Sequence, residues 1–384
     1  QFQNQHILFP IGDRVKFSIN VFGSSFAQPA FVNIANLFVP HTIDACFEPA
    51  GDRVVGGIKN EADEWNLEGH PDRVLFITNK DLALFAQLYD EDGTDPLEAR
   101  LPALHTTQLL AVLQKFAQQP QRLGDLKGEY FSTVMFDETY AQRDGTIKRE
   151  TSFPQDPSQW ILSGPHFFVG NPLYNTPREI CNSNKAYDSI DLLTIPDDYL
   201  PRTNYLPACS ADEYRSRTPK VSWVEEGETE PKRVTEYYRL FARSMLSQEG
   251  ERTLIPTLMP KKVTHINPVV SWTFKSTSRL LTSFASCASL VFDFWVKTTG
   301  NPRFRDNLFK FLPMVNTDEQ LNSRAFALSS VTNHYTDLWN NCWNPAFTQQ
   351  SWSIRPDSDH PGAHVLPQNF FNQLTPNWQR HNTL

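Results

Sequence analysis

Basic side chains gather in one part of an otherwise acidic sequence, at spacings that suit contact with phosphate. Two arginines stand four residues apart, and two lysines follow a proline shortly afterwards. These four residues are Arg239, Arg243, Lys261 and Lys262. The apolar residues Tyr237, Phe241 and Met245 recur at helical spacing, which predicts a helix with the arginines one turn apart on another face. Arginine on a helix and lysine on the next loop can bind a phosphate chain. A solvated helix face beside an ordinary loop is the alternative.

Further basic residues after position 151 lie next to aromatic residues or in short turns. Arginine and lysine on such loops present the donors that phosphates and base edges accept. Any one of them alone is more often an ordinary surface residue, so the prediction depends on their concentration within an acidic chain. The predicted DNA-contact set is Arg178, Lys185, Arg202, Arg239, Arg243, Arg252, Lys261, Lys262, Lys275, Arg279, Arg303 and Arg305.

The sequence supplies no set of catalytic residues. Methyl transfer to adenine from S-adenosylmethionine needs a glycine-rich turn after a strand and an Asn or Asp, Pro, Pro, aromatic tetrad for the flipped base. The nearest stretch, Asn171–Tyr174, lacks the second proline and has no such turn before it. A proline-fixed turn is therefore predicted there, and an enzyme built on this loop is a further alternative. His70 and His166 lie near Gly and Pro, which favours structural hydrogen bonds.

Cysteine usage and hydropathy restrict the compartment. The five cysteines lie far apart and form no CxxC pair, so no zinc or other metal site is predicted. An odd, sparse set is typical of reduced thiols, which indicates a cytoplasmic protein. No run reaches the length of a membrane span, and no secretory signal opens the sequence.

Composition indicates a packed protein with long ordered loops. The 384 residues are 40% hydrophobic and 12% aromatic, which is ample for a core. Twenty-eight prolines against 16 glycines favour fixed loops over a simple helical bundle. The formal net charge of −8 argues against non-specific coating of nucleic acid, but it leaves room for a local basic groove.

The order of predicted elements indicates a mixed α+β fold with two lobes. Residues 1–150 form the N-terminal lobe, with strands near 15–19, 74–78 and 128–139 and helices from Asp81 and over 104–118. The polar, proline-containing stretch 145–160 is predicted to connect the lobes.

Residues 151–384 form the second lobe, which is rich in loops. The proline- and aromatic-rich stretch 160–208 reads as ordered loops laid over a core. An edge strand with an internal Pro256 is expected near 253–259, and helices over 280–297 and 318–339. The tail, residues 340–384, carries Trp343, Trp352 and Trp378 and is expected to pack over the core or over a missing continuation of the chain.

Several segments resemble the region downstream of the catalytic domain in large adenine-specific (N6) DNA methyltransferases of bacterial restriction-modification and phage-defence systems. The segments are GHPDRVLFITNKDLALFAQLYD, SGPHFFVGNPLYNTPRE with YLPRTNY, YYRLFARSMLSQEGERTLIPTLMP, and LVFDFWVKTTG with LFKFLPM and SRAFALSSVTNHYTDLW. The resemblance implies a target-recognition region, in which the ERTLIP and LPM segments flank the base-reading core. It assigns no individual base contact.

The resemblance also sets expectations about what accompanies the chain. The cofactor and catalytic motifs of the family are missing, so the chain is expected to be a C-terminal fragment with no cofactor of its own. S-adenosylmethionine would bind the methyltransferase domain that precedes it in the full-length protein. Double-stranded DNA is the expected partner. A scaffold that docks a nuclease, helicase or other defence subunit is the alternative, favoured by the acidic balance and the Trp-rich tail.

Overall fold

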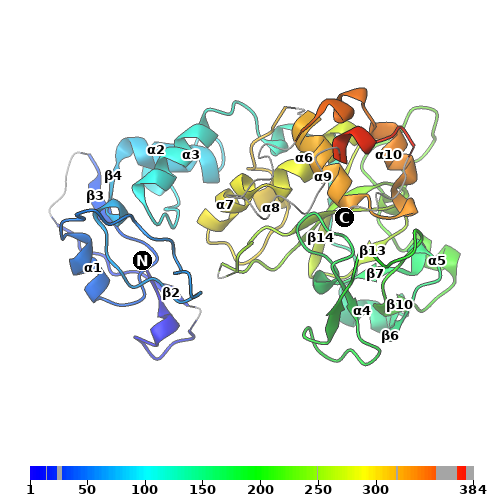
Figure 1. Ribbon diagram of the computed structural model, residues 1–384, viewed down its shortest axis with the longest axis horizontal. Helices are drawn as coiled ribbons and strands as arrows, with labels where there is room; N and C mark the ends of the chain where they lie inside the picture. The colour runs from blue at the N-terminus through cyan, green and yellow to red at the C-terminus, as the bar shows by residue number, and fades with distance from the viewer. Residues whose placement is uncertain (14, 24–27, 249, 317–318, 352–369, 378–384) are drawn as a thin grey trace. The chain divides into compact units, whose positions relative to one another are not determined.

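The computed structural model describes the chain apart from residues 14, 24–27, 249, 317–318, 352–369 and 378–384 (Figure 1). The chain divides into two compact units. Unit 1 comprises Gln1–Arg122 and Trp295–Gly300, and unit 2 comprises Leu123–Phe294 and Asn301–Leu384. Helices and small sheets occur in both, so the mixed α+β class is confirmed.

The described residues of unit 1 form two short strand pairs and three α-helices, together with the end of α7. Both strand pairs are antiparallel, β1 with β2 and β3 with β4. The strands are β1 (Phe2–Gln3), β2 (Lys16–Phe17), β3 (Ala30–Asn33) and β4 (Leu75–Thr78), and the helices are α1 (His41–Cys46), α2 (Asn79–Tyr89) and α3 (Thr107–Ala117).

Helix α2 shows how closely local sequence determines this unit. Leu82, Phe85 and Leu88 share its buried face, as their spacing predicts. Thr78, rather than Asp81, is the N-cap: its backbone N–H donates to the Asp81 carboxylate at 2.9 Å, completing a capping box. The Tyr89 hydroxyl at the other end lies 2.8 Å from the Thr298 hydroxyl, which ties the helix to residues 295–300.

Unit 2 is built around a four-stranded antiparallel sheet in the order β12-β11-β14-β5. Smaller pairings join β6 to β10, β7 to β13, and β8 to β9. The strands are β5 (Tyr130–Thr133), β6 (Ile147–Ser152), β7 (Ile161–Leu162), β8 (Asn175–Pro177), β9 (Tyr187–Ser189), β10 (Thr203–Pro207), β11 (Arg239–Arg243), β12 (Pro256–Met259), β13 (Thr264–His265) and β14 (Val269–Phe274). The helices are α4 (Glu138–Arg143), α5 (Ala211–Ser216), α6 (Thr277–Ala288), α7 (Leu290–Thr298, whose last residues belong to unit 1), α8 (Asp306–Phe309), α9 (Glu319–Ser329) and α10 (Thr336–Cys342).

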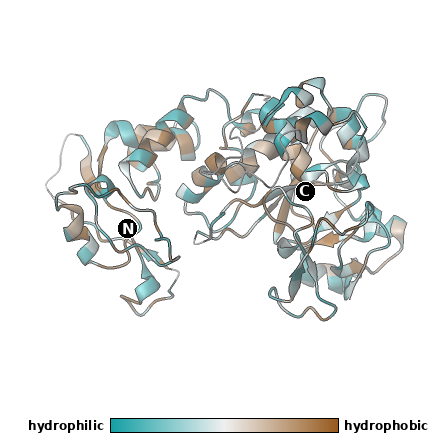
Figure 2. Ribbon diagram, in the orientation of Figure 1, coloured by the Kyte–Doolittle hydropathy of each residue, from teal (hydrophilic) through white to brown (hydrophobic). Residues whose placement is uncertain are grey.

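The core of unit 2 lies on both faces of this sheet. All six residues of β14 are buried, and the Trp272 ring stacks on Phe309 of α8 with centroids 4.2 Å apart. On the opposite face, Phe241 belongs to a buried apolar cluster that includes Trp160 and Phe167. Figure 2 shows the same distribution, with hydrophobic colour along the central strands and on α6 and α7.

The helix predicted around residues 239–243 is wrong, because these residues form the central strand β11. Residues four apart share a face in a helix, but four is an even number, so they also share a face in a strand. Tyr237, Phe241 and Met245 therefore fit both periods. Backbone pairing to strands on either side decides the outcome, with β12 and β14 both antiparallel to β11. The edge strand with Pro256 is confirmed, since β12 ends the sheet.

Two boundaries also differ from the sequence prediction. The stretch 145–160 is not a connector between lobes, because β6 pairs with β10 inside unit 2. Likewise β5 is part of the main sheet, so the chain divides after Arg122 instead of at residue 150. Polar residues on β6 lie on the exposed face of a strand, which gives the stretch its linker-like composition.

The two long helices predicted in the second lobe are each interrupted. Ser289 is extended and its hydroxyl accepts from the Phe292 backbone N–H, so it starts α7 after α6 ends. The predicted helix 318–339 splits into α9 and α10, and Leu328, expected on the buried face, is 51% exposed. Among the described residues no single helix is long and apolar enough to cross a membrane; α6 and α7 reach that length only together, and they bend by 69°.

Part of the tail packs on the core, as predicted. Phe371 and Leu374 are buried, and the Trp339 indole donates to the Thr375 carbonyl at 2.8 Å. Trp352 and Trp378 lie outside the described residues. Within the described part of the tail, the expected packing is therefore confirmed at Phe347, Phe371 and Leu374.

Candidate nucleic-acid interface

A groove of about 770 Å³ opens on unit 2. One side is formed by β6, β10 and α5, and another by the turn between β12 and β13. Hydrogen-bonding and charged side chains make up most of the lining. They are Lys148, Asp156, Ser158, Gln159, Asp212, Tyr214, Arg215, Thr218, Thr235, Glu236, Lys261, Lys262 and Thr264, with Cys209 among the remaining lining residues.

Four cations line this groove, and three of them already have a carboxylate beside them. Lys148 lies 2.7 Å from Glu150, Arg215 3.3 Å from Glu236, and Lys261 3.7 Å from Asp337. Exposed ion pairs of this kind contribute about 0–1 kcal/mol, so an approaching phosphate can replace the carboxylate. Within the described parts of the chain, Lys262 has no ion pair.

The lysine pair is placed by a tight turn after β12. Lys262 has a φ of 73°, in the left-handed region that disfavours residues with a Cβ. Its backbone N–H donates to the Thr235 carbonyl at 2.6 Å, which fixes the turn against the neighbouring segment. Both lysine side chains stay exposed, and the Lys261 ammonium lies 5.2 Å from the Tyr238 ring centroid.

The floor of the groove is polar and buried. The Tyr214 hydroxyl and Thr264 Oγ1 are 2.6 Å apart, and burial raises the pKa of Tyr214, so the phenol stays protonated at neutral pH. Arg239 lies directly behind this floor: its guanidinium donates to the Val263 carbonyl, between two lining residues. The floor therefore rests on a buried positive charge.

Three arginines of the predicted DNA-contact set point inward instead of toward solvent. Arg239 is fully buried, and burial lowers its pKa to about 9. Arg243 donates to the Phe167 carbonyl, and burial lowers its pKa to about 10. Arg252 pairs with buried Asp293 at 3.5 Å and donates to the Ala288 carbonyl at 2.9 Å. Strand pairing and packing thus place these three in the interior, and direct phosphate contact by them is not supported.

Other members of the set lie at the surface but apart from the groove lining. Arg178 pairs with Asp188 at 2.8 Å across β8 and β9, with exposed Lys185 in the turn between those strands. The Arg202 guanidinium lies 4.5 Å from the centroid of the half-exposed Phe153 ring. DNA contact by these residues stays a prediction.

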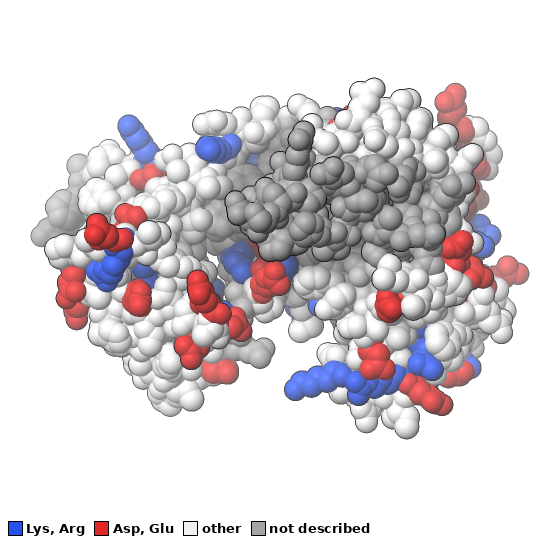
Figure 3. All heavy atoms as spheres, in the orientation of Figure 1, with Lys and Arg blue, Asp and Glu red and all other residues white. Residues whose placement is uncertain are grey.

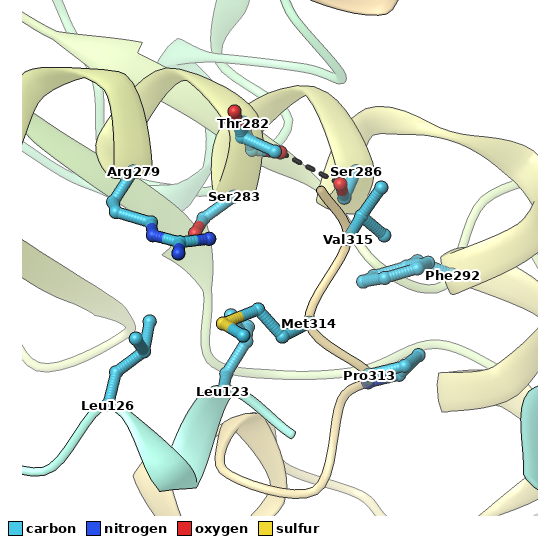
Figure 4. Close-up of a pocket in the computed structure, with 10 residues that line it drawn as sticks. All are labelled: Leu123, Leu126, Arg279, Thr282, Ser283, Ser286, Phe292, Pro313, Met314 and Val315. Carbon is cyan, nitrogen blue, oxygen red and sulfur yellow. Dashed lines mark hydrogen bonds between the residues drawn. The ribbon is translucent and has the colours of Figure 1, made fainter. Parts of the chain in front are cut away.

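The last four members flank the sheet and α6. Lys275 lies 3.4 Å from Glu129, and Arg305 donates to the Asn267 side chain at 2.6 Å, while Arg303 is exposed. Arg279 lines a small pocket with Met314 beside α6 (Figure 4). That pocket holds about 10 Å³, roughly one water molecule, so it cannot accept a base or a phosphate. On the face drawn in Figure 3, positive side chains lie among negative ones instead of forming one continuous patch.

Of the predicted DNA-contact set, Lys261 and Lys262 line the groove, whereas Lys148 and Arg215 on its opposite side are not in that set. Lys148 lies in the stretch 145–160 that the sequence predicts as a connector, and its strand β6 has three consecutive exposed polar residues without clear alternation. Arg215 lies on the short helix α5, whose N-cap Ser210 accepts from the Glu213 N–H at 3.3 Å. That cap was visible in the sequence.

The buried histidines serve the fold. His166 Nδ1 accepts from the Ser163 backbone N–H at 3.0 Å, and Nε2 faces the Arg202 carbonyl at 3.0 Å. Both ring nitrogens are thus engaged, and burial lowers the pKa of His166 to about 4. The Ser163 hydroxyl, 3.0 Å from the ring, belongs to the same link and not to an open nucleophile–base pair. The structural hydrogen bonds predicted for His166 are confirmed, as are those of His70.

The Asn171 stretch forms the turn predicted for it. Asn171 Oδ1 accepts from the Leu173 N–H at 2.9 Å, and the Tyr174 ring packs on Phe168 with centroids 5.1 Å apart. The aromatic ring is thus occupied by packing. Within the described residues no group of three or more His, Cys, Asp or Glu side chains could hold a metal ion, and the five cysteines are free thiols.

Comparison of the sequence with protein-family models and with curated proteins finds no match. The groove is an open, polar cleft whose lining includes four cations, three acids and several neutral donors. Such a lining suits a ligand that carries both phosphate and hydrogen-bonding edges.

Proposed function

We propose that unit 2 contacts double-stranded DNA through this groove, as the sequence-recognition region of an adenine-N6 DNA methyltransferase of restriction-modification or phage-defence type. The observation that carries the proposal is the convergence of Lys148, Arg215, Lys261 and Lys262 on one groove with neutral donors between them. The family-like run that ends at Pro260 leads directly into the lysine turn. The adenine-modifying chemistry, with S-adenosylmethionine, belongs to a separate catalytic domain.

Each part of the groove has a role in this proposal. The cations bind backbone phosphates and set the register of the duplex. Side chains such as Gln159, Ser158 and Asp212 can pair with base edges, since amides and hydroxyls bond to several bases and carboxylates accept from cytosine N4. Weak surface pairs keep the cations in place until DNA displaces the carboxylates.

A matched pair of double variants tests the proposal. Lys261→Gln/Lys262→Gln removes two groove charges, and Lys127→Gln/Lys220→Gln removes two exposed lysines outside the groove lining, so both variants have the same net charge. Binding of labelled duplexes of random sequence is measured by fluorescence anisotropy at several salt concentrations. We expect weaker binding and a shallower salt dependence in the groove variant alone. Equal losses in both variants, or no binding by the unmodified chain, would contradict the proposal.

A second candidate function is protein docking by unit 1, because this unit exposes apolar side chains. Val21 is 95% and Phe22 89% exposed, and Ile7 and Ile19 are each more than 60% exposed. Large exposed apolar residues gathered in one segment indicate a surface that a partner covers. The test is pull-down of the products of neighbouring genes by the intact chain and by Val21→Ser/Phe22→Ser. Loss of a partner only in the variant, with DNA binding unchanged, would favour scaffolding.

A further inference from the structure

Lys262 differs from every other cation of the groove in two respects. Its backbone is held in the left-handed region, and its ammonium has no carboxylate partner among the described residues. A left-handed conformation costs a residue with a Cβ about 1–2 kcal/mol. Strain of this kind persists where the surrounding structure enforces it, often at ligand-binding positions. Here the hydrogen bond from Lys262 N–H to the Thr235 carbonyl enforces it.

A hydroxyl pair lies beside this lysine in the lining. Tyr214 and Thr264 are hydrogen-bonded to each other at 2.6 Å. Each has one O–H, and only one hydrogen is used between them, so the pair retains one hydrogen for another acceptor. Both residues are almost fully buried, at 4% and 1% exposure, and both line the groove.

Beneath the pair lies the Arg239 guanidinium, which has no carboxylate partner among the described residues. It donates to the Val263 carbonyl, and within the described part of the chain its Nε has no hydrogen-bond partner. Val263 stands between Lys262 and Thr264, so the charge lies just behind the segment 262–264, which is called the strip below. In a buried setting the field of such a charge is screened far less than in water.

Two of the three acids of the groove already have hydrogen-bond or ion-pair partners. Asp156 accepts from the Ser158 N–H at 2.7 Å, and Glu236 binds both Arg215 and the Arg233 N–H. Asp212 lies in the first turn of α5, on the same helix as Arg215. The strip from Lys262 to Thr264 itself carries no carboxylate.

We propose that residues 262–264 and Tyr214 together form a phosphate subsite. In it, the Lys262 ammonium and the free hydrogen of the Tyr214–Thr264 pair bind one phosphate group above the buried Arg239. The subsite rests on the proposed function in one respect: it assigns the phosphate to the DNA backbone. The other groove cations then bind neighbouring positions after releasing their carboxylates.

Inorganic phosphate is the probe for this subsite. Its ³¹P line width is followed at constant ionic strength with the full chain, with Lys262→Gln, and with Lys220→Gln as the control of equal charge. We expect broadening with the full chain and the control, and its loss in Lys262→Gln. Undiminished broadening in Lys262→Gln, or none with the full chain, would overturn the subsite.

Alkylation of Cys209 tests where the phosphate binds, because this partly buried thiol lines the same groove. The other thiol that is not buried, Cys342, is replaced by Ser so that iodoacetamide reports on Cys209. Phosphate is expected to slow alkylation several-fold, whereas chloride at equal ionic strength does not. Unchanged alkylation of Cys209 while phosphate is bound would place the anion elsewhere and overturn the subsite.

Competition separates this proposal from the proposed function. A short duplex should displace phosphate from the full chain. If the duplex fails to displace phosphate, while Lys262→Gln still abolishes phosphate binding, the subsite is retained but DNA is not its ligand. Duplex binding that persists without any phosphate broadening would remove the subsite and keep the DNA-binding function.

Discussion

At the scale of single residues, Arg239 and Lys262 show how surroundings decide what a positive charge can do. Arg239 lies on a central strand, where a backbone carbonyl and the Phe241 ring surround its guanidinium. Lys262 lies in a strained turn with its ammonium exposed. Arg239 can act on a ligand only through its electric field, whereas the Lys262 ammonium can contact the ligand directly. Mutations at the two positions should therefore have different effects.

Lys262→Asn separates strain from binding. Asn tolerates the left-handed region better than Lys, so the free energy of unfolding should stay equal or rise by up to about 1 kcal/mol. Phosphate and duplex binding should fall, because the ammonium is gone. Urea unfolding followed by tryptophan fluorescence measures the first effect, and ³¹P line width and anisotropy measure the second. A variant that is both less stable and weaker in binding would point to a structural role alone.

The buried histidines predict how stability depends on pH. Burial lowers the pKa of His166 to about 4 and that of His265 to about 3, against about 6.5 in the unfolded chain. Between these values the unfolded state binds more protons. The free energy of unfolding of unit 2 should therefore fall as pH drops below about 6.5, by up to about 1.4 kcal/mol per pH unit for each histidine. Urea unfolding between pH 7 and pH 5 measures this slope.

His166→Gln provides the control for that slope. Gln can keep a donor near the Arg202 carbonyl but does not titrate. The number of protons taken up on unfolding, which sets the slope, should therefore fall by about one. Most carboxylates titrate below this window, since their unfolded pKa is near 4. An unchanged slope in the variant would mean that His166 does not supply the effect.

At the scale of elements, Arg252 joins the bend between α6 and α7 to the start of β12. It donates to the carbonyls of Ala288 and Ser289 at the end of α6, where a cation also complements the helix dipole. It also pairs with Asp293, which accepts from the Thr253 and Leu254 N–H groups. One side chain thus links two helices and a strand.

Arg252→Ala should destabilise unit 2 by about 3–5 kcal/mol, because it leaves the buried Asp293 carboxylate without its partner. Lys261→Ala, at an exposed position with a 3.7 Å ion pair, should change stability by less than about 1 kcal/mol. Thermal and urea unfolding compare the two. Similar stability for both variants would contradict the role of Arg252 as a joint.

The elements also show what the sequence could and could not reveal. Helix α2 follows from its own cap and apolar spacing, all of which lie between Thr78 and Leu88 in the sequence. Strand β11 does not, because spacing of four fits both periods and its state depends on β12 and β14. As β11 is an inner strand with packed side chains on both faces, Arg239 is buried and Arg243 is partly buried. The lysine turn was found because a loop after a proline stays at the surface whatever the sheet does.

At the scale of the whole molecule, the net charge of −8 sets a limit on how DNA can be bound. The chain repels a polyanion at long range, and attraction arises where local cations outnumber local acids. Four cations and three acids line the groove, and two carboxylates outside the lining, Glu150 and Asp337, pair with Lys148 and Lys261. Only a few phosphates can then be neutralised.

The salt dependence of duplex binding should accordingly be shallow. Each neutralised phosphate contributes about 0.9 to the slope of log K against log salt concentration, so one to four contacts give a magnitude between about 1 and 4. Lys262→Gln should reduce that slope by about 0.9, while Lys220→Gln should leave it unchanged. Anisotropy titrations from low to physiological salt measure it. A slope near 10, as for proteins with many phosphate contacts, would require a larger basic surface than this groove offers and would place the DNA elsewhere on the chain.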